Sequence, residues 1–153
     1  MGIRIDKYKR YVGRQFKFGI TDCYTIVRDF YKDEYNIRLR NYARYDKFWE
    51  DESLYLKFFK NEGFVLADDE LRFGDVILIA FGAKCACHAA VYLGERKILH
   101  HVQNRFSTIE NYDGIWKNWT VCVVRHKNVL NKENIIVFDF EKGKGEERCV
   151  VQI

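Results

Sequence analysis

The stretch from Val76 to Val102 constrains the fold of this 153-residue chain more than any other part of its sequence. It contains three short segments with the composition of β-strands, separated by glycine-containing turns: Val76–Phe81, Cys87–Leu93 and Lys97–Val102. Connections this short join antiparallel neighbours, because a parallel crossover needs about a dozen residues or more. A further segment, Val121–Arg125, has the same character. The sequence therefore predicts an antiparallel meander.

Two helical patterns come before these strands. The first opens after Thr21 and Asp22, which are both good N-cap residues, and its apolar face is formed by Cys23, Ile26, Val27 and Phe30. The second runs from about Asp51 to Asn61 and stops before Gly63, where a glycine cap is expected. Helices first and an antiparallel sheet afterwards predict an α+β domain.

Cys23 opens the first predicted helix, at the end where the helix dipole is positive. This position favours the thiolate, the nucleophilic form of cysteine, over the thiol. A base supplied from elsewhere in the chain would complete a catalytic pair. The alternative is an inert buried thiol, because cysteine is among the residue types most often found in protein interiors.

The composition is that of a globular protein with one domain. The hydrophobic fraction is 48%, and we expect neither a membrane span nor a secretory signal. The net charge of +4 is spread among acidic residues, which predicts a solvated surface and no nucleic-acid partner. Five cysteines, an odd number, argue against a disulfide framework and for synthesis in a reducing cytoplasm.

Three of the four histidines lie on the predicted hairpin between the second and third strands. Side chains alternate between the faces of a strand, and an odd-length loop pairs Ala90 with His100. His88 and His100 are then diagonal neighbours on one face, and His101 points to the other. With a cysteine at a helix start, this predicts a nucleophile, a base and an orienting group. His88 would take the proton from Cys23, and His100 would fix the tautomer of His88.

The order of these features resembles the NlpC family of papain-like cell-wall cysteine peptidases. The matching motifs are Asp22-Cys23 at a helix start, Gly74-Asp75 before an apolar strand, His88-Ala89-Ala90-Val91-Tyr92-Leu93-Gly94, and Ile98-Leu99-His100. The resemblance extends over about residues 8–126 and implies an NlpC-like peptidase domain at 1–126. The stretch from Phe16 to Tyr24 looks most like the version of this domain in tail assembly proteins of long-tailed phages.

The resemblance implies roles for four residues. Cys23 matches the nucleophile, His88 the base and His100 the third polar residue, and Asp22 matches an acid that in several members binds the free amine of the substrate peptide. The family cleaves peptide bonds within peptidoglycan stems without a metal, so no cofactor is expected. Many members have tyrosine where this chain has Phe16. Phenylalanine has no hydroxyl, so the oxyanion contact must come from the backbone N–H of Cys23 or from another group.

The same resemblance implies a biological setting. The protein would be made in the cytoplasm of a bacterial host and would act on the host cell wall from the virion tail tip, with peptidoglycan stem peptides and other tail-tip proteins as partners. Residues 127–153 fall outside the family core. Within them, Ile135–Phe140 and Cys149–Ile153 predict an appended β-hairpin. This hairpin either extends the sheet of the domain or docks onto neighbouring tail-tip proteins.

Three other interpretations are open on the sequence. A metal site could use Cys85, Cys87, His88, His100, His101 and Cys122, although their spacing is not that of a zinc knuckle. The domain could be a non-catalytic, structural part of a tail tip. The thiol could also serve an amidase or acyltransferase on the same fold. Related amidases often carry Asn or Glu in the place of His100, which favours the peptidase.

Overall fold

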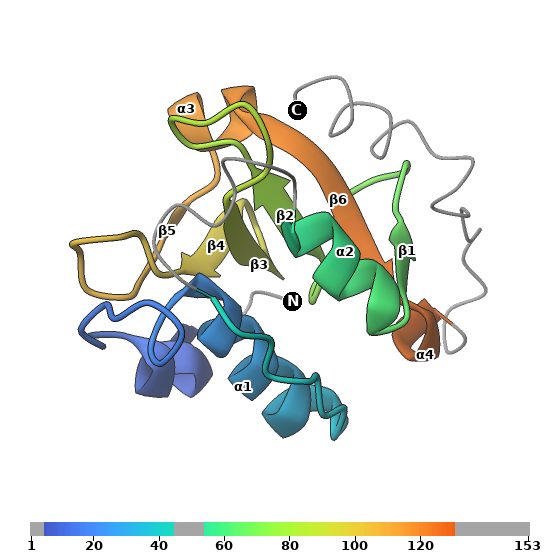
Figure 1. Ribbon diagram of the computed structural model, residues 1–153, viewed down its shortest axis with the longest axis horizontal. Helices are drawn as coiled ribbons and strands as arrows, with labels where there is room; N and C mark the ends of the chain where they lie inside the picture. Colours follow the sequence, from blue (N-terminus) through green and yellow to red (C-terminus); the bar gives the residue numbers. More distant parts are fainter. Residues whose placement is uncertain (1–4, 45–53, 131–153) are drawn as a thin grey trace.

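The computed structural model describes residues 5–44 and 54–130. The helices of these residues are η1 (Ile5–Tyr11), α1 (Cys23–Tyr35), α2 (Leu54–Asn61), α3 (Gly114–Asn118) and α4 (Lys127–Leu130). The strands are β1 (Phe64–Leu66), β2 (Val76–Ile79), β3 (His88–Gly94), β4 (Lys97–His100), β5 (Thr108–Asn111) and β6 (Thr120–His126). The helices η1, α1 and α2 precede the strands, and only the short helices α3 and α4 come later, so the predicted α+β class is confirmed (Figure 1).

The described strands form one antiparallel sheet in the order β1-β6-β2-β3-β4-β5. β2 to β5 are the predicted meander with one more strand, and β6 returns to lie between β1 and β2 (Figure 1). Ala90 pairs with His100, and Tyr92 pairs with Ile98, as predicted. β5 is absent from the sequence prediction, because Thr108–Asn111 has a single apolar residue and no alternating pattern.

β2 is buried on both faces of the sheet, which explains its continuous apolar sequence. Val76 and Leu78 belong to the larger core, which also contains the apolar faces of α1 and α2. Ile77 and Ile79 belong to a second cluster that includes Trp116 of α3. Burial of each such side chain contributes roughly 1.5–3 kcal/mol, so β2 holds the two layers of the domain together.

α1 packs against β3 and β4, the two strands that carry the histidine pair. Its apolar face is buried as predicted, through Cys23, Ile26, Val27 and Phe30. The facing strand has a small, fully buried side chain at Ala89, which belongs to the same core as the apolar face of α1. A small residue lets the backbone of β3 lie close to the helix, so the N-terminus of α1 lies beside the histidines.

The Gly74-Asp75 motif has a structural explanation. Gly74 has a φ of +90°, and a Cβ at this position would overlap the hydroxyl of Tyr35, so a side chain does not fit. Asp75 forms a buried ion pair with Arg125 of β6, with 2.6 Å between Oδ1 and Nε. The motif therefore connects the start of β2 to the end of β6.

Residues 127–130, which follow the predicted family core, form α4 and contact the rest of the domain. The backbone N–H of Lys127 donates to the carbonyl of Gly63 at 3.0 Å, and Val129 packs on the core. The hairpin predicted from Ile135–Phe140 and Cys149–Ile153 lies outside the described residues. In residues 5–44 and 54–130, no helix is long and apolar enough to cross a membrane.

Candidate active site

Cys23 is held at the start of α1 by its neighbour Asp22. Asp22 is the N-cap residue, with an extended backbone (φ −131°, ψ −170°), and its carboxylate accepts from the backbone N–H of Thr25 at 3.0 Å. The hydroxyl of Thr25 and the backbone N–H of Asp22 complete a capping box. Cys23 is only 3% exposed, so its sulfur is a buried atom in a fixed position.

Cys23 and His88 line one narrow cavity of about 70 Å³. Its other described lining residues, many of them aromatic, are Phe16, Phe18, Tyr55, Phe81, Cys87, His101, Val102 and Gln103. A volume of this size holds only a few water molecules. The structure therefore brings the predicted nucleophile and the predicted base to the same narrow, partly open cavity.

His88, His100 and Glu110 form a chain of hydrogen bonds on one face of the sheet. Nε2 of His88 lies 2.9 Å from Nδ1 of His100, and Nε2 of His100 lies 2.7 Å from Oε2 of Glu110. An ionised carboxylate only accepts, so Nε2 of His100 carries the proton that it donates to Glu110. In this tautomer, Nδ1 of His100 accepts from Nε2 of His88. Nδ1 of His88 then has the lone pair that a general base needs.

Glu110 is itself held in place by two further donors. The indole N–H of Trp116 donates to Oε1 at 3.1 Å, and Arg105 contacts Oε2 at 3.2 Å. These contacts, with the hydrogen bond from His100 as the largest effect, lower the pKa of Glu110 to about 2. The ring of Trp116 also lies edge-on to that of His100, with 4.9 Å between the ring centres. The carboxylate therefore stays ionised and fixes the orientation of His100 at neutral pH.

The resting site is a neutral thiol beside a neutral imidazole. Burial raises the pKa of Cys23 to about 12, the charge of Asp22 acts in the same direction, and a hydrogen bond from Tyr55 opposes it. Burial likewise lowers the pKa of His88 well below 6.5, and His100 adds to this effect. The sequence argument that the helix dipole favours a thiolate is thus outweighed by burial. The arrangement can act by general-base catalysis, with proton transfer at the moment of attack.

Tyr55 makes a direct contact with the candidate nucleophile. Its hydroxyl lies 2.9 Å from Sγ of Cys23, although the two residues are 32 positions apart in the chain. The sequence predicts a helix over the residues of α2 but indicates no role for Tyr55. Nothing in the sequence links the two residues, because the contact depends on how α2 and α1 pack together.

Asp22 is surrounded by donors from the protein itself. Arg44 forms a two-point ion pair with its carboxylate, from Nε at 2.7 Å and from Nη2 at 3.1 Å. The backbone N–H groups of Gly19 and Thr25 donate to the same group. Asp22 is 1% exposed, and the side chain of Arg44 is fully buried. Binding the amine of a substrate, the role implied by the resemblance, stays a prediction; the geometry shown is that of a structural anchor.

His101 is separate from the chain formed by His88, His100 and Glu110. Its Nε2 donates to the carbonyl of Arg105 at 3.0 Å, and its ring lies edge-on to Phe16 with 5.1 Å between centres. This agrees with the expectation that His101 points away from the other two histidines and pairs elsewhere. It nevertheless lines the same cavity, since that cavity lies where β4 ends and the chain turns away from the sheet.

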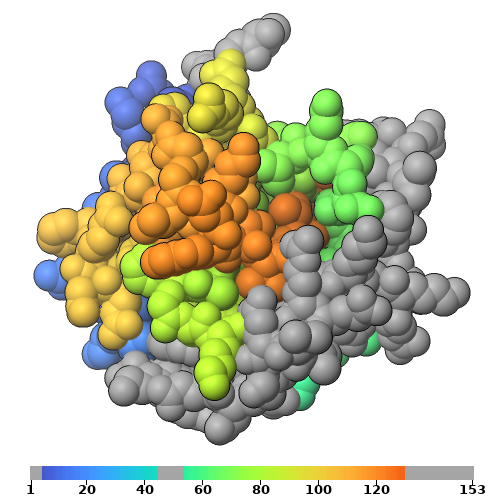
Figure 2. All heavy atoms as spheres, turned by 90° about the horizontal axis from the view of Figure 1, so that it is seen from above, coloured from blue at the N-terminus to red at the C-terminus, as the bar shows by residue number. Residues whose placement is uncertain are grey.

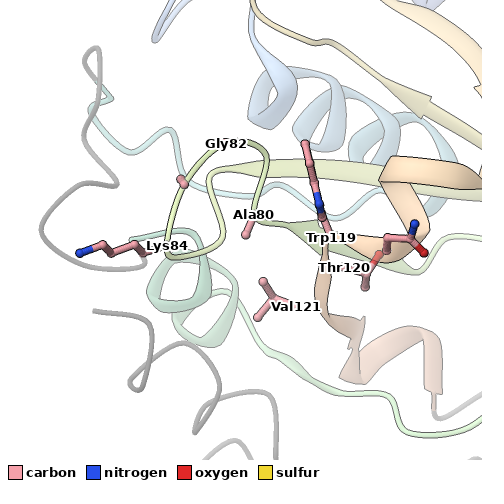
Figure 3. Close-up of a pocket in the computed structure, with 8 residues that line it drawn as sticks. Ala80, Gly82, Lys84, Trp119, Thr120 and Val121 are labelled. Atoms are coloured by element: carbon pink, nitrogen blue, oxygen red, sulfur yellow. The ribbon is translucent and has the colours of Figure 1, made fainter.

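A second, more open hollow of about 580 Å³ lies beside the segment that follows β2. It is lined by Ala80, Gly82, Ala83, Lys84, Asn118, Trp119, Thr120 and Val121. Figure 2 shows the segment around residue 80 and the start of β6 side by side on one face of the molecule. In Figure 3, Lys84 extends away from the other labelled side chains. Among the described residues that line this hollow there is no cysteine or histidine, so it lacks the groups for thiol chemistry.

Residues 5–44 and 54–130 contain no group of three or more His, Cys, Asp or Glu side chains placed to hold a metal ion. Cys87 hydrogen-bonds through its sulfur to the carbonyl of Phe81 at 3.2 Å. His88 and His100 are engaged with each other. The reactive groups that the structure places at this site are a thiol, two imidazoles and a carboxylate.

A cysteine at a helix start, packed against a histidine-bearing antiparallel sheet, is the arrangement expected of the papain-like family predicted above. The family model for the NlpC/P60 family matches residues 13–125. The chain belongs to the NlpC/P60 family.

Two curated relatives add to this result. The chain is 35% identical over 117 residues to tail tip assembly protein K of Escherichia phage lambda, over 75% of this chain and 58% of that protein. It is 28% identical over 123 residues to tail tip assembly protein K of Escherichia phage N15, over 78% of this chain and 51% of that protein. The chain thus spans a little over half the length of these relatives.

Proposed function

We propose that this domain is a cysteine peptidase that cleaves peptide bonds in the stem peptides of bacterial peptidoglycan. The single observation that carries the proposal is the cavity shared by Cys23 and His88, with His88 oriented by His100 and Glu110. Membership of the NlpC/P60 family supports the choice of substrate class. Peptide hydrolysis at such a site needs no group beyond those described.

In the proposed mechanism, Sγ of Cys23 attacks the carbonyl carbon of the scissile bond while Nδ1 of His88 takes the thiol proton. The tetrahedral intermediate collapses to a thioester, and His88 gives that proton to the leaving amine. His88 then takes a proton from a water molecule that attacks the thioester. The carboxylic acid leaves, and the proton returns to the sulfur.

Purified protein incubated with muropeptides tests this function. We expect products in which one water has been added across an amide bond of the stem, identified by mass. Cys23→Ala and Cys23→Ser should abolish cleavage. Cys87→Ala is the matched control, because Cys87 is a second thiol in the same cavity and has no part in the mechanism. Normal cleavage by Cys23→Ala would contradict the mechanism, and release of intact stems from the sugar would indicate an amidase.

The names of the two relatives support a place in the tail tip of a phage virion, with other tail proteins as partners and synthesis in the host cytoplasm. A phage that carries Cys23→Ala separates the two roles. If its tails assemble normally but penetrate the cell wall poorly, the domain acts as an enzyme in the tail. If penetration is unchanged, its contribution there is structural. Removal of residues 131–153 tests docking: the shortened protein should still cleave muropeptides but should no longer enter tails.

A further inference from the structure

We propose that Tyr55 is a further catalytic residue of this site, whose hydroxyl donates a hydrogen bond to the negative charge that forms on Cys23 and passes to the substrate oxygen. This inference rests on the proposed function, because the charge forms only if Cys23 attacks a carbonyl. It starts from one contact, the 2.9 Å between the hydroxyl of Tyr55 and Sγ of Cys23.

The ring of Tyr55 is buried and packs against two neighbouring aromatic rings. Tyr55 is 2% exposed and lies in the first turn of α2. Its ring stacks on that of Tyr24 with 6.3 Å between centres and lies edge-on to Phe58 at 6.0 Å. Tyr24 directly follows Cys23 in α1, so the residue next to the nucleophile also positions the hydroxyl. A donor held in advance needs no reorganisation during the reaction.

The location of the hydroxyl suits both stages of the attack. Sγ carries the charge as His88 takes its proton, and the hydroxyl is already within hydrogen-bond distance of that sulfur. In the tetrahedral intermediate the charge moves to an oxygen two bonds from Sγ, which lies in the same small cavity. Of the aromatic residues that line this cavity, Phe16, Phe18 and Phe81 have no hydroxyl to offer.

Tyr55 acts as a donor and not as a second base. Burial raises the pKa of Tyr55 well above 10, and the proximity of Cys23 adds to this effect. The hydroxyl therefore keeps its proton at neutral pH, also when the sulfur is negative. His88, whose pKa lies well below 6.5, is the neighbour that can accept the proton. His88 therefore removes the thiol proton of Cys23, and Tyr55 stabilises the negative charge left on the sulfur.

Tyr55→Phe tests this role, because it removes one oxygen and keeps the ring. We expect kcat on a muropeptide to fall about 100-fold with KM changed by less than about 2-fold. Tyr112→Phe is the matched control, since Tyr112 is also buried but its hydroxyl contacts Thr120 in the other core cluster. Alkylation of Cys23 by iodoacetamide, followed by peptide mass analysis, gives a second readout. It should slow in Tyr55→Phe and not in the control, because the thiolate loses a donor.

These readouts separate failure of this inference from failure of the proposed function. If the wild type cleaves and Tyr55→Phe cleaves equally well, the role of Tyr55 is overturned and the peptidase assignment stands. If the wild type cleaves nothing but alkylation still slows in Tyr55→Phe, the peptidase assignment fails and the donor role toward sulfur stands. Difluorotyrosine incorporated at position 55 covers the case in which the phenylalanine variant folds poorly. It retains shape and hydroxyl but is a stronger donor, so an unchanged alkylation rate would overturn the inference.

Discussion

Nε2 of His100 lies 2.7 Å from Oε2 of Glu110, and this contact determines which nitrogen of His88 can accept a proton. Glu110 acts on the sulfur of Cys23 indirectly, through its hydrogen bond to His100 and the hydrogen bond from His100 to His88. Glu110 is therefore a positioning residue, and its effect should depend on its ability to accept hydrogen bonds at both carboxylate oxygens at once.

Replacement of Glu110 by Gln should lower kcat about 10- to 100-fold with little effect on KM. The carboxylate now accepts from both Trp116 and His100, whereas an amide has a single oxygen. One of the two donors then faces the amide NH₂, and the tautomer of His100 is no longer fixed. Steady-state kinetics on a muropeptide measure the effect. Glu70→Gln, an exposed site, is the control, and equal losses in both variants would contradict the positioning role.

The pH dependence of kcat/KM should distinguish a general base from a preformed ion pair. Because the pKa of His88 is lowered, the imidazole is neutral above its ordinary value of 6.5, and activity should be constant from about pH 7 to 9. Activity should decline only in the acid range below 6.5, as His88 becomes protonated. An alkaline decline within that plateau would instead indicate that the active form contains a protonated imidazole.

Asp22→Asn should destabilise the protein by about 3–5 kcal/mol, since it leaves the buried guanidinium of Arg44 without a counter-charge. Asp29→Asn is the matched control: its partner Arg14 forms a more exposed pair, worth about 1 kcal/mol or less. Urea unfolding at neutral pH measures both. The pKa of Asp22 is lowered, so its stabilising effect is present above the ordinary value of 3.8 and is lost as the pH falls through the lower folded value.

Unchanged stability of the Asp22→Asn variant would instead support the role that the family resemblance implies for Asp22. In that case Asp22→Asn would unfold at the same urea concentration as the wild type and would lose affinity only for substrates with a free amino terminus.

His101→Ala should cost much less activity than His88→Ala, although both histidines line the cavity. His88 holds the lone pair that takes the thiol proton, so its removal should lower kcat by about 1,000-fold or more. His101 donates a hydrogen bond to the carbonyl of Arg105 and packs against Phe16. Its loss should therefore mainly loosen the packing on one side of the cavity. Parallel kinetics on the two variants compare the losses, and similar values would place His101 in the reaction itself.

The parts of the site that sequence reasoning predicts are those set by local geometry. The start of α1 follows from its cap and from the helical spacing of its apolar residues. The pairing of His88 with His100 follows from strand alternation and from the register of the turn between β3 and β4. Both are short-range rules, so a single sequence is enough to apply them.

The residues that sequence reasoning misses depend on elements or on tertiary contacts that short-range rules do not detect. Glu110 lies on β5, opposite Ile98 and diagonal to His100, so the same rule of diagonal neighbours would have found it once β5 was recognised. Tyr55 and Arg44 reach Cys23 and Asp22 from other segments, through helix packing and through an aperiodic stretch. Such contacts depend on tertiary structure, which propensity and spacing do not determine.

Because of the order of the strands, the backbone amides of the two halves of the site should differ in their protection from hydrogen exchange. β3, which carries His88, is flanked by β2 and β4, whereas β5, which carries Glu110, has a single neighbour in the described sheet. The amide hydrogens of an edge strand are released by small local openings, and those of a central strand require far more of the fold to open. Glu110 can therefore separate from His100 while His88 stays in place, and the protein would spend brief intervals folded but with its base disoriented.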